Sequence, residues 1–188
     1  MNTAEVLPKL VRADLDDRDH YEIIDGQRVE LPPMSVDSQV LGSRLLRHLS
    51  NFGIAQNIGE AYAEVLFKLP LQKERNRKPD VAFVSYARWP KYKPMPDTNA
   101  WDVLPELCVE VVSPNDTGDE IETKVDEYLL AGVSRVWVVY PRQERLYVYE
   151  SASQIRRFTR ADTIAGDTVL SGFELPLSEL FLQAPPAP

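Results

Sequence analysis

Residues 107 to 140 constrain the fold of this chain most strongly, because their pattern predicts a strand, a helix and a second strand. The first strand is LCVEVVS (107–113). The helix is predicted over 118–131, and Gly132 is expected to end it. The run VSRVWVVY (133–140) is dense in β-branched and aromatic residues, which is typical of a strand. A unit of this kind joins two parallel strands of one sheet, here within a mixed sheet.

The rest of the chain predicts further strands and one more long helix. A turn at Asp25-Gly26 predicts a hairpin over YEIIDGQRVEL (21–31). A period of 3.6 in the apolar residues then predicts a helix that Ser35 caps and Gly53 ends. The remaining predicted strands are AYAEVLFKLPL (61–71), PDVAFVS (79–85) and RLYVYES (145–151). The proline-rich segment 86–107 is expected to be an ordered loop.

These elements define the predicted fold class, which is α/β (α+β). We expect a mixed sheet of about six or more strands flanked by two long helices, with the hairpin at the amino-terminal side. At 188 residues the chain is long enough for one hydrophobic core. Residues 1–182 are therefore predicted to form a single domain. The ending QAPPAP, residues 183–188, is predicted to be a disordered tail.

Composition limits the classes of protein to which the chain can belong. The share of apolar residues is 44% and that of charged residues is 27%, both typical of a folded globular protein. No apolar run reaches the roughly 18 residues of a membrane helix, and the amino terminus lacks the pattern of a secretory signal. One cysteine, Cys108, excludes an internal disulfide. We therefore expect a cytoplasmic protein with no membrane segment.

The net charge of −8, from 21 basic and 29 acidic residues, argues against a general nucleic-acid coat protein, which needs clustered Lys and Arg. It does not exclude a nuclease, because metal-binding acids add negative charge locally and a basic strip can coexist with an acidic total. One such strip is KERNRKP (73–79). A solvated hairpin loop is the preferred interpretation of this strip, and a DNA contact is the alternative.

A carboxylate in the middle of a buried strand needs an explanation. Glu110 lies within the apolar run 107–113, where a buried charge is costly unless it is paired or binds a metal. Asp80 lies in a similar position, at the start of the apolar run that follows Pro79. Packing alone does not explain two acids near the ends of adjacent buried strands, whereas a role as oxygen ligands for Mg²⁺ or Mn²⁺ does. A divalent ion on Asp80 and Glu110 could activate a water for attack on a phosphodiester.

A lysine beside these acids would position the nucleophile or offset the negative charge of the transition state. The expected place for it, two residues after Glu110 on the same strand face, is taken by Val112. Lys124, in the helix that follows, could reach back across the strand end to Glu110 and take that role. The alternative is a surface pair between Lys124 and Glu120, worth only about 0.3 kcal/mol.

An ordered set of motifs along the chain resembles the Uma family of restriction endonucleases, within the PD-(D/E)XK nuclease superfamily. The similarity runs from about Tyr21 to Leu180 and includes the YEIIDG hairpin, the helix after it and the ending GFELPLSEL. The motifs that carry it are PDVAFVS, LCVEVVSP, Asp119 or Asp116, Lys124, Tyr128, Gly132-Val133 and Trp137. The resemblance implies a restriction-endonuclease-like core with acids at one end of the sheet.

The resemblance also implies a set of roles. Asp80 matches the motif aspartate and Glu110 the motif glutamate, both as ligands of Mg²⁺ or Mn²⁺. Lys124 matches the catalytic lysine, moved in this family from the strand to the helix. The implied activity is metal-dependent hydrolysis of DNA by an endonuclease, and the implied assembly is a homodimer.

The chain departs from the family pattern at Ser38, where members often carry a histidine. If that histidine assists the reaction or steers the substrate, activity here is weakened. A further acid is common in the superfamily, and Glu22, Glu30 and Asp37 are the candidates for it. Strand alternation explains Glu22 and Glu30 equally well as solvent-facing residues. Tyr128 is a possible accessory residue, because it stacks on Lys124 at i, i+4.

Other polar and aromatic residues give weaker signals. His20 and His48 are far apart in the sequence and show no metal-ligand spacing. Trp89, Tyr92 and Trp101 could stack on bases, or they could anchor the proline-rich loop to the core.

Three functions compete at this point. The first is a metal-dependent endonuclease acting on DNA. The second is a catalytically inactive binding module that keeps the nuclease fold, which the acidic net charge and Ser38 favour. The third is a structural role for Glu110, as a buried acid paired with Lys124. Metal binding separates the first from the second, and a Glu110→Gln variant that loses stability without losing any activity would identify the third.

Overall fold

The centre of the molecule is a six-stranded mixed sheet with the strand order β10-β9-β8-β7-β6-β3. Its strands are β3 (Gly59–Ala63), β6 (Val81–Ser85), β7 (Leu107–Val111), β8 (Arg135–Tyr140), β9 (Arg145–Ser151) and β10 (Gln154–Thr159). Strands β7 and β8 run parallel and are joined by helix α2 (Gly118–Ala131), while the other neighbours are antiparallel. The predicted strand–helix–strand unit and the predicted mixed sheet are both confirmed.

This computed structural model describes residues 20–182. The predicted disordered tail at 183–188 and the first part of the predicted domain, residues 1–19, lie outside the described residues. Within them, no helix is both long and apolar enough to cross a membrane.

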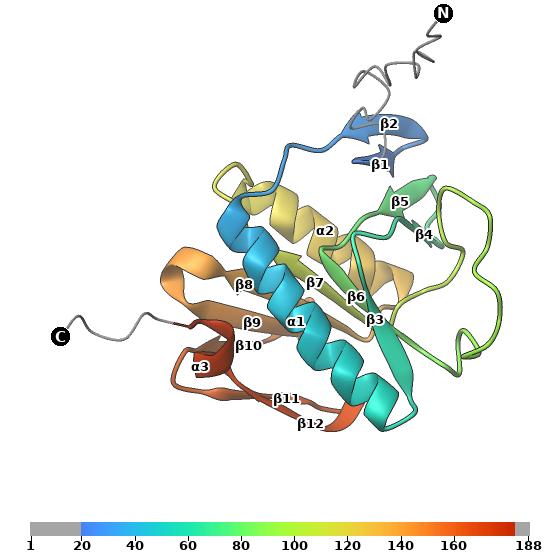
Figure 1. The fold of residues 1–188 in the computed structure, drawn as a ribbon. Coiled ribbons are helices and arrows are strands. Elements are labelled where there is room, and N and C mark those ends of the chain that lie inside the picture. Colours follow the sequence, from blue (N-terminus) through green and yellow to red (C-terminus); the bar gives the residue numbers. More distant parts are fainter. Residues whose placement is uncertain (1–19, 183–188) are drawn as a thin grey trace, which may run out of the picture.

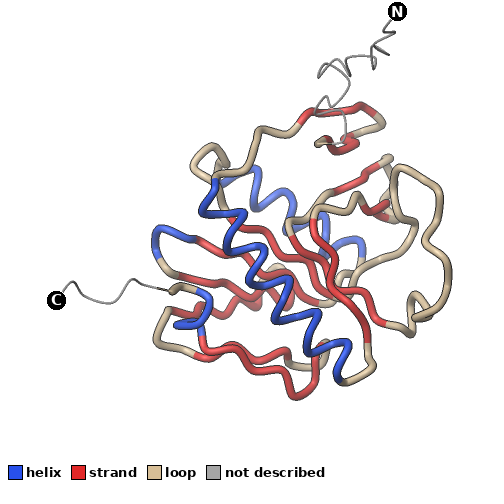
Figure 2. The backbone as a smooth tube through the Cα atoms, in the orientation of Figure 1, coloured by secondary structure: helices blue, strands red, loops and turns tan. Residues whose placement is uncertain are grey.

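The two long helices lie on opposite faces of the central sheet, α1 in front and α2 behind in Figure 2. Side chains of β7 alternate between these faces. Leu107, Val109 and Val111 belong to the core under α1, whereas Cys108 packs with residues of α2. Glu110, which shares the alternation of Cys108, therefore points toward α2.

Local sequence explains where the helices begin and end. Helix α1 (Val36–Ala55) begins after Ser35, whose side chain accepts a hydrogen bond from the Ser38 backbone N–H, as predicted. Its predicted end at Gly53 is wrong, because the helix continues to Ala55. A Cβ at Gly53 would lie 2.6 Å from both the Gly59 carbonyl and the Phe83 ring. Glycine is needed here for close packing and not as a helix stop.

Local sequence bounds helix α2 at both ends, and Gly132 is its predicted end. Thr117 and Glu120 form a reciprocal capping box at its start. Gly132 ends it in the left-handed conformation, at φ 97°, which glycine adopts without steric cost. The predicted bounds of this helix are confirmed.

A second, four-stranded sheet with the order β2-β1-β5-β4 stands beside the central one (Figure 1). Its strands are β1 (Tyr21–Ile24), β2 (Gln27–Glu30), β4 (Phe67–Leu69) and β5 (Arg75–Arg77). The predicted hairpin over 21–31 is confirmed as β1 and β2. Two other predictions are wrong, because 61–71 is broken into β3 and β4 at Glu64, which has a φ of 51°, and because the basic strip 73–79 contains β5. Strand β5 pairs with β1 and β4 and is not a solvated loop.

The carboxyl-terminal elements complete the core under α1. They are β11 (Thr163–Gly166), β12 (Leu170–Pro176) and α3 (Leu177–Leu180). A short 3-10 turn, η2 (Pro141–Gln143), joins β8 to β9 earlier in the chain. The proline-rich loop crosses the other side of the sheet. Trp101 in this loop is buried and contacts the rings of Phe67, Tyr62 and Trp89, so Trp101 and Trp89 anchor the loop.

Candidate active site

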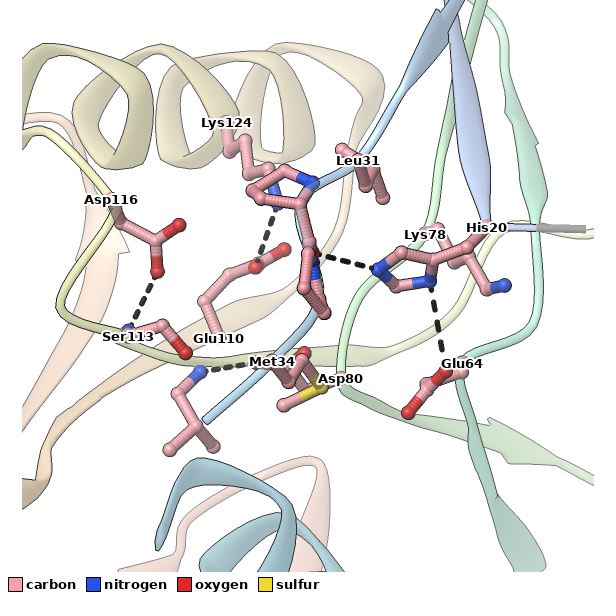
Figure 3. Close-up of a pocket in the computed structure, with 13 residues that line it drawn as sticks. His20, Leu31, Met34, Glu64, Lys78, Asp80, Glu110, Ser113, Asp116 and Lys124 are labelled. Carbon is pink, nitrogen blue, oxygen red and sulfur yellow. Dashed lines mark hydrogen bonds and ion pairs between the residues drawn. The ribbon is translucent and has the colours of Figure 1, made fainter. Parts of the chain in front are cut away.

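The two acids singled out in the sequence lie side by side, Asp80 just before the start of β6 and Glu110 near the end of the neighbouring strand β7. Strands β6 and β7 pair with Val81 opposite Val109, and extending that register by one residue places Asp80 opposite Glu110. Both acids line one pocket of about 50 Å³ (Figure 3). That volume is several times what one water molecule needs.

Glu110 is held by two donors from α2. Its side chain is buried, with 3% of the residue exposed. The Lys124 ammonium donates to Oε2 at 3.0 Å, and the Tyr128 hydroxyl donates to Oε1 at 2.7 Å. Lys124 and Tyr128 are one helical turn apart, so both reach the same carboxylate. The predicted contact of Lys124 with Glu110 is therefore present, whereas Glu120 is engaged in the capping box of α2.

Asp80 has one carboxylate oxygen fixed by the neighbouring strand. The Val111 backbone N–H donates to Asp80 Oδ2 at 2.5 Å. Because this bond crosses from β7 to the start of β6, it sets the orientation of the carboxylate relative to Glu110. Asp80, Glu110 and Lys124 come from three different elements and all line the same pocket (Figure 3).

The surroundings of Asp80 and Glu110 disfavour the charged forms of both carboxyl groups. Burial raises the pKa of Asp80 well above its ordinary value, and the neighbouring charge of Glu110 raises it further. Burial also raises the pKa of Glu110, and the charge of Lys124 offsets this only in part. A divalent cation between the two carboxylates would favour their ionised forms, so this pair has the electrostatics of a cation site.

The protonated form of Lys124 is favoured in this environment. Burial by itself lowers the pKa of its ammonium, but the charges of Glu110, Glu22 and Asp80 outweigh burial and raise the pKa above the ordinary lysine value. A lysine that stays protonated cannot remove a proton from water. Its chemistry in this pocket is restricted to donating hydrogen bonds and stabilising negative charge.

The candidates for a further acid differ widely in their surroundings. Glu22 is not solvent-facing, since 1% of it is exposed, and it pairs with Arg77 and approaches Lys124. Glu30 lies on the exposed strand β2, where it pairs with Arg28, and it does not line the pocket with Asp80. Asp37 is exposed in the first turn of α1 and lines a neighbouring pocket.

Ser38, at which the sequence departs from the pattern expected of the resemblance, is buried. The Ser38 hydroxyl accepts a hydrogen bond from the Ser113 hydroxyl at 3.0 Å and is 2.8 Å from the Ser35 hydroxyl. Ser113 lines the pocket of Asp80 and Glu110. Ser38 therefore ties the start of α1 to the end of β7, next to the site.

Two further residues of this pocket were not among the predicted site residues. His20 lines the pocket, with Nε2 at 3.1 Å from the Pro32 carbonyl and Nδ1 at 3.9 Å from Glu64 (Figure 3). His20 is far in sequence from the acids of the pocket, so no motif spacing could assign it to this site. Asp116 also lines the pocket and accepts a hydrogen bond from the Ser113 N–H; in the sequence it was named, as an alternative to Asp119, in the motif series of the family resemblance.

The carboxylate ligands fit a magnesium or manganese ion that takes its remaining ligands from water and from the substrate. Among residues 20–182 there is no cluster of three or more His, Cys, Asp or Glu side chains arranged to hold a metal, so an all-protein cage is absent there. Mg²⁺ commonly binds through one or two carboxylates, with waters and substrate phosphates as its other ligands. Asp80 and Glu110 supply those two carboxylates.

Comparisons with known proteins agree with this fold. A family model described as "Uma2: Putative restriction endonuclease" matches residues 7–178. A crystal structure from Anabaena variabilis ATCC 29413, titled as a putative nuclease belonging to DUF820, is similar at a TM-score of 0.75 and 18% sequence identity, over 86% of this chain and 89% of that chain. The DrdV–DNA complex matches at a TM-score of 0.37 and 15% identity, over 76% of this chain and 11% of that chain. No curated protein matches the chain. The predicted restriction-endonuclease-like fold class is confirmed.

Proposed function

The chain belongs to the Uma2 family, whose description is "Putative restriction endonuclease", and from this membership we propose that it is a metal-dependent endonuclease that hydrolyses phosphodiester bonds in DNA. The observation that carries the proposal is the meeting of Asp80, Glu110 and Lys124 in one pocket.

The proposed roles follow from the contacts of each residue. Asp80 and Glu110 would hold Mg²⁺ or Mn²⁺, which when bound would supply Lewis acidity and lower the pKa of a water. Lys124 stabilises the negative charge that develops on the phosphate. Tyr128 donates to Glu110 and fixes the rotamer of that carboxylate, so it acts as an accessory residue.

The proposal includes a substrate and an assembly. DNA is the proposed substrate because of the family's description, "Putative restriction endonuclease"; the pocket offers a cation, Lys124, for a phosphate and paired acids for a metal. The proposed active form is a homodimer of a single-domain chain, in which each subunit carries one such pocket.

Cleavage of DNA by the purified protein tests the proposed function. We expect supercoiled plasmid to be nicked or linearised in Mg²⁺ or Mn²⁺, and to stay intact when EDTA is added. Calorimetry with Mn²⁺ should show binding in the same buffer. A protein that neither binds Mn²⁺ nor cuts DNA would contradict the proposal and support the catalytically inactive binding module.

A further inference from the structure

Lys124 belongs to a row of alternating charges that leads away from the pocket. We call this row the charge chain; its members are Glu110, Lys124, Glu22, Arg77 and Glu127. Lys124 Nζ lies 3.0 Å from Glu110 Oε2 and 3.7 Å from Glu22 Oε1. Arg77 donates through Nη1 to Glu22 at 2.5 Å and through Nε to Glu127 at 2.6 Å. Each charge therefore contacts at least one charge of opposite sign.

The inner members of the charge chain are removed from water. Glu22 is 1% exposed and Arg77 is 4% exposed. In such surroundings an ion pair is screened little by solvent, and loss of one partner leaves the other as an uncompensated buried charge. The side chain of Lys124, 17% exposed, stands between this buried segment and the pocket.

Glu22 is held outside the pocket by two donors. Its Oε2 accepts from Arg77, and its Oε1 accepts from the Lys78 backbone N–H at 3.0 Å. It also does not line the pocket of Asp80 and Glu110. The remaining role for this buried acid is as a second, competing counter-ion for Lys124.

Arg77 contacts Glu22 directly and can therefore influence this competition. With Arg77 present, the charge of Glu22 is neutralised and Lys124 stays closer to Glu110 than to Glu22. Without Arg77, Glu22 would attract the Lys124 ammonium away from the pocket. We propose that Arg77 is a positioning residue, which holds Lys124 on Glu110 by occupying Glu22. The inference rests on the proposed function in so far as Lys124 assists cleavage.

Replacing Arg77 with methionine tests the proposal through activity. We expect kcat for plasmid cleavage to fall about tenfold, the scale seen for supporting residues around metal sites, with an unchanged KM for DNA. The double variant Glu22→Gln/Arg77→Met removes both charges, so it should recover kcat to within about twofold of the wild type. A double variant as slow as Arg77→Met, or a single variant with the wild-type kcat, would overturn the proposal.

A matched control separates positioning from stability. Arg135, whose side chain is 18% exposed, pairs with Glu150 at 3.5 Å and Asp167 at 3.9 Å. It lies at the start of β8, opposite Leu107 and so at the other end of β7 from Glu110. Arg135→Met should lower the melting temperature and leave kcat unchanged.

A crystal structure of Arg77→Met decides the same question without any activity. We expect the Lys124 Nζ to leave Glu110 and to contact Glu22. An unchanged contact with Glu110 would refute the positioning role. If the wild type cuts no DNA, the proposed function fails, and this structure still shows whether Arg77 places Lys124.

Discussion

Replacing Lys124 with methionine should lower the rate of metal-dependent DNA cleavage by about 10²- to 10³-fold, the effect of removing one preorganised donor from a transition-state site. Lys124 donates to Glu110 at 3.0 Å, and in the proposed mechanism its ammonium would stabilise the charge that develops on the phosphate. Because the ammonium occupies Glu110 Oε2, its removal frees that oxygen. Affinity for Mn²⁺ should therefore be retained or increased while kcat falls.

The same substitution has a cost in stability. Glu110 and Glu22 share Lys124 as a counter-ion, and breaking a buried pair costs about 3–5 kcal/mol. Thermal unfolding should report this loss, so cleavage is measured well below the melting temperature. Lys124→Arg, which keeps the charge, should retain more activity than Lys124→Met. Cleavage by Lys124→Met at the wild-type rate would exclude the lysine from the mechanism.

Replacing Asp80 with asparagine should lower the rate of cleavage by on the order of 10³-fold, because several kcal/mol of metal-derived stabilisation would be lost. It should also weaken Mn²⁺ binding in calorimetry. The asparagine side-chain oxygen can still accept the hydrogen bond from the Val111 N–H, so the strand pairing is preserved. Wild-type cleavage by this variant would remove Asp80 from the site.

The stability of the metal-free Asp80→Asn variant should change in the opposite direction from its activity. Because burial and Glu110 raise the pKa of Asp80 in the folded protein, the stabilising contribution of Asp80 is complete below its unfolded pKa and is lost as pH rises through its folded pKa. Asparagine does not titrate and avoids that loss. At pH 8 we expect the variant to be more stable than the wild type, with a melting temperature higher by about 2–4 °C for each kcal/mol gained.

This gain in stability distinguishes an acid that serves function from an acid that stabilises the fold. A structural Asp80 would stabilise the fold at pH 8, and its replacement would lower the melting temperature. The difference between wild type and Asp80→Asn should shrink toward acidic pH, where the aspartate is protonated. A melting temperature that falls at every pH would show that Asp80 serves packing.

Much of the fold could be predicted because it depends on local patterns. The alternation in 107–113 placed Glu110 on one face of β7, and the 3.6 period after Gly118 placed Lys124 and Tyr128 on one face of α2. Gly132 marked the end of that helix, since its left-handed conformation favours glycine. The contact between Lys124 and Glu110 follows from these patterns once the crossover helix packs on its own strand.

The parts that could not be predicted depend on contacts between distant segments. Glu22 alternates in a short hairpin and has the pattern of a surface residue, yet Arg77, 55 positions later, buries it. Strand β5 is only three residues long, and its charged sequence resembles a loop until β1 pairs with it. Gly53 was misassigned because the neighbour that demands a glycine, Phe83, lies 30 positions away.

Anomalous diffraction from crystals soaked in Mn²⁺ would locate the ion in the pocket directly. If Asp80 and Glu110 form a metal centre, the map should show one peak between them, about 2.1 Å from a carboxylate oxygen of each, with Lys124 still adjacent. A pocket that stays without a peak at saturating Mn²⁺, or a peak bound only elsewhere on the protein, would contradict the assignment of these residues as the catalytic centre.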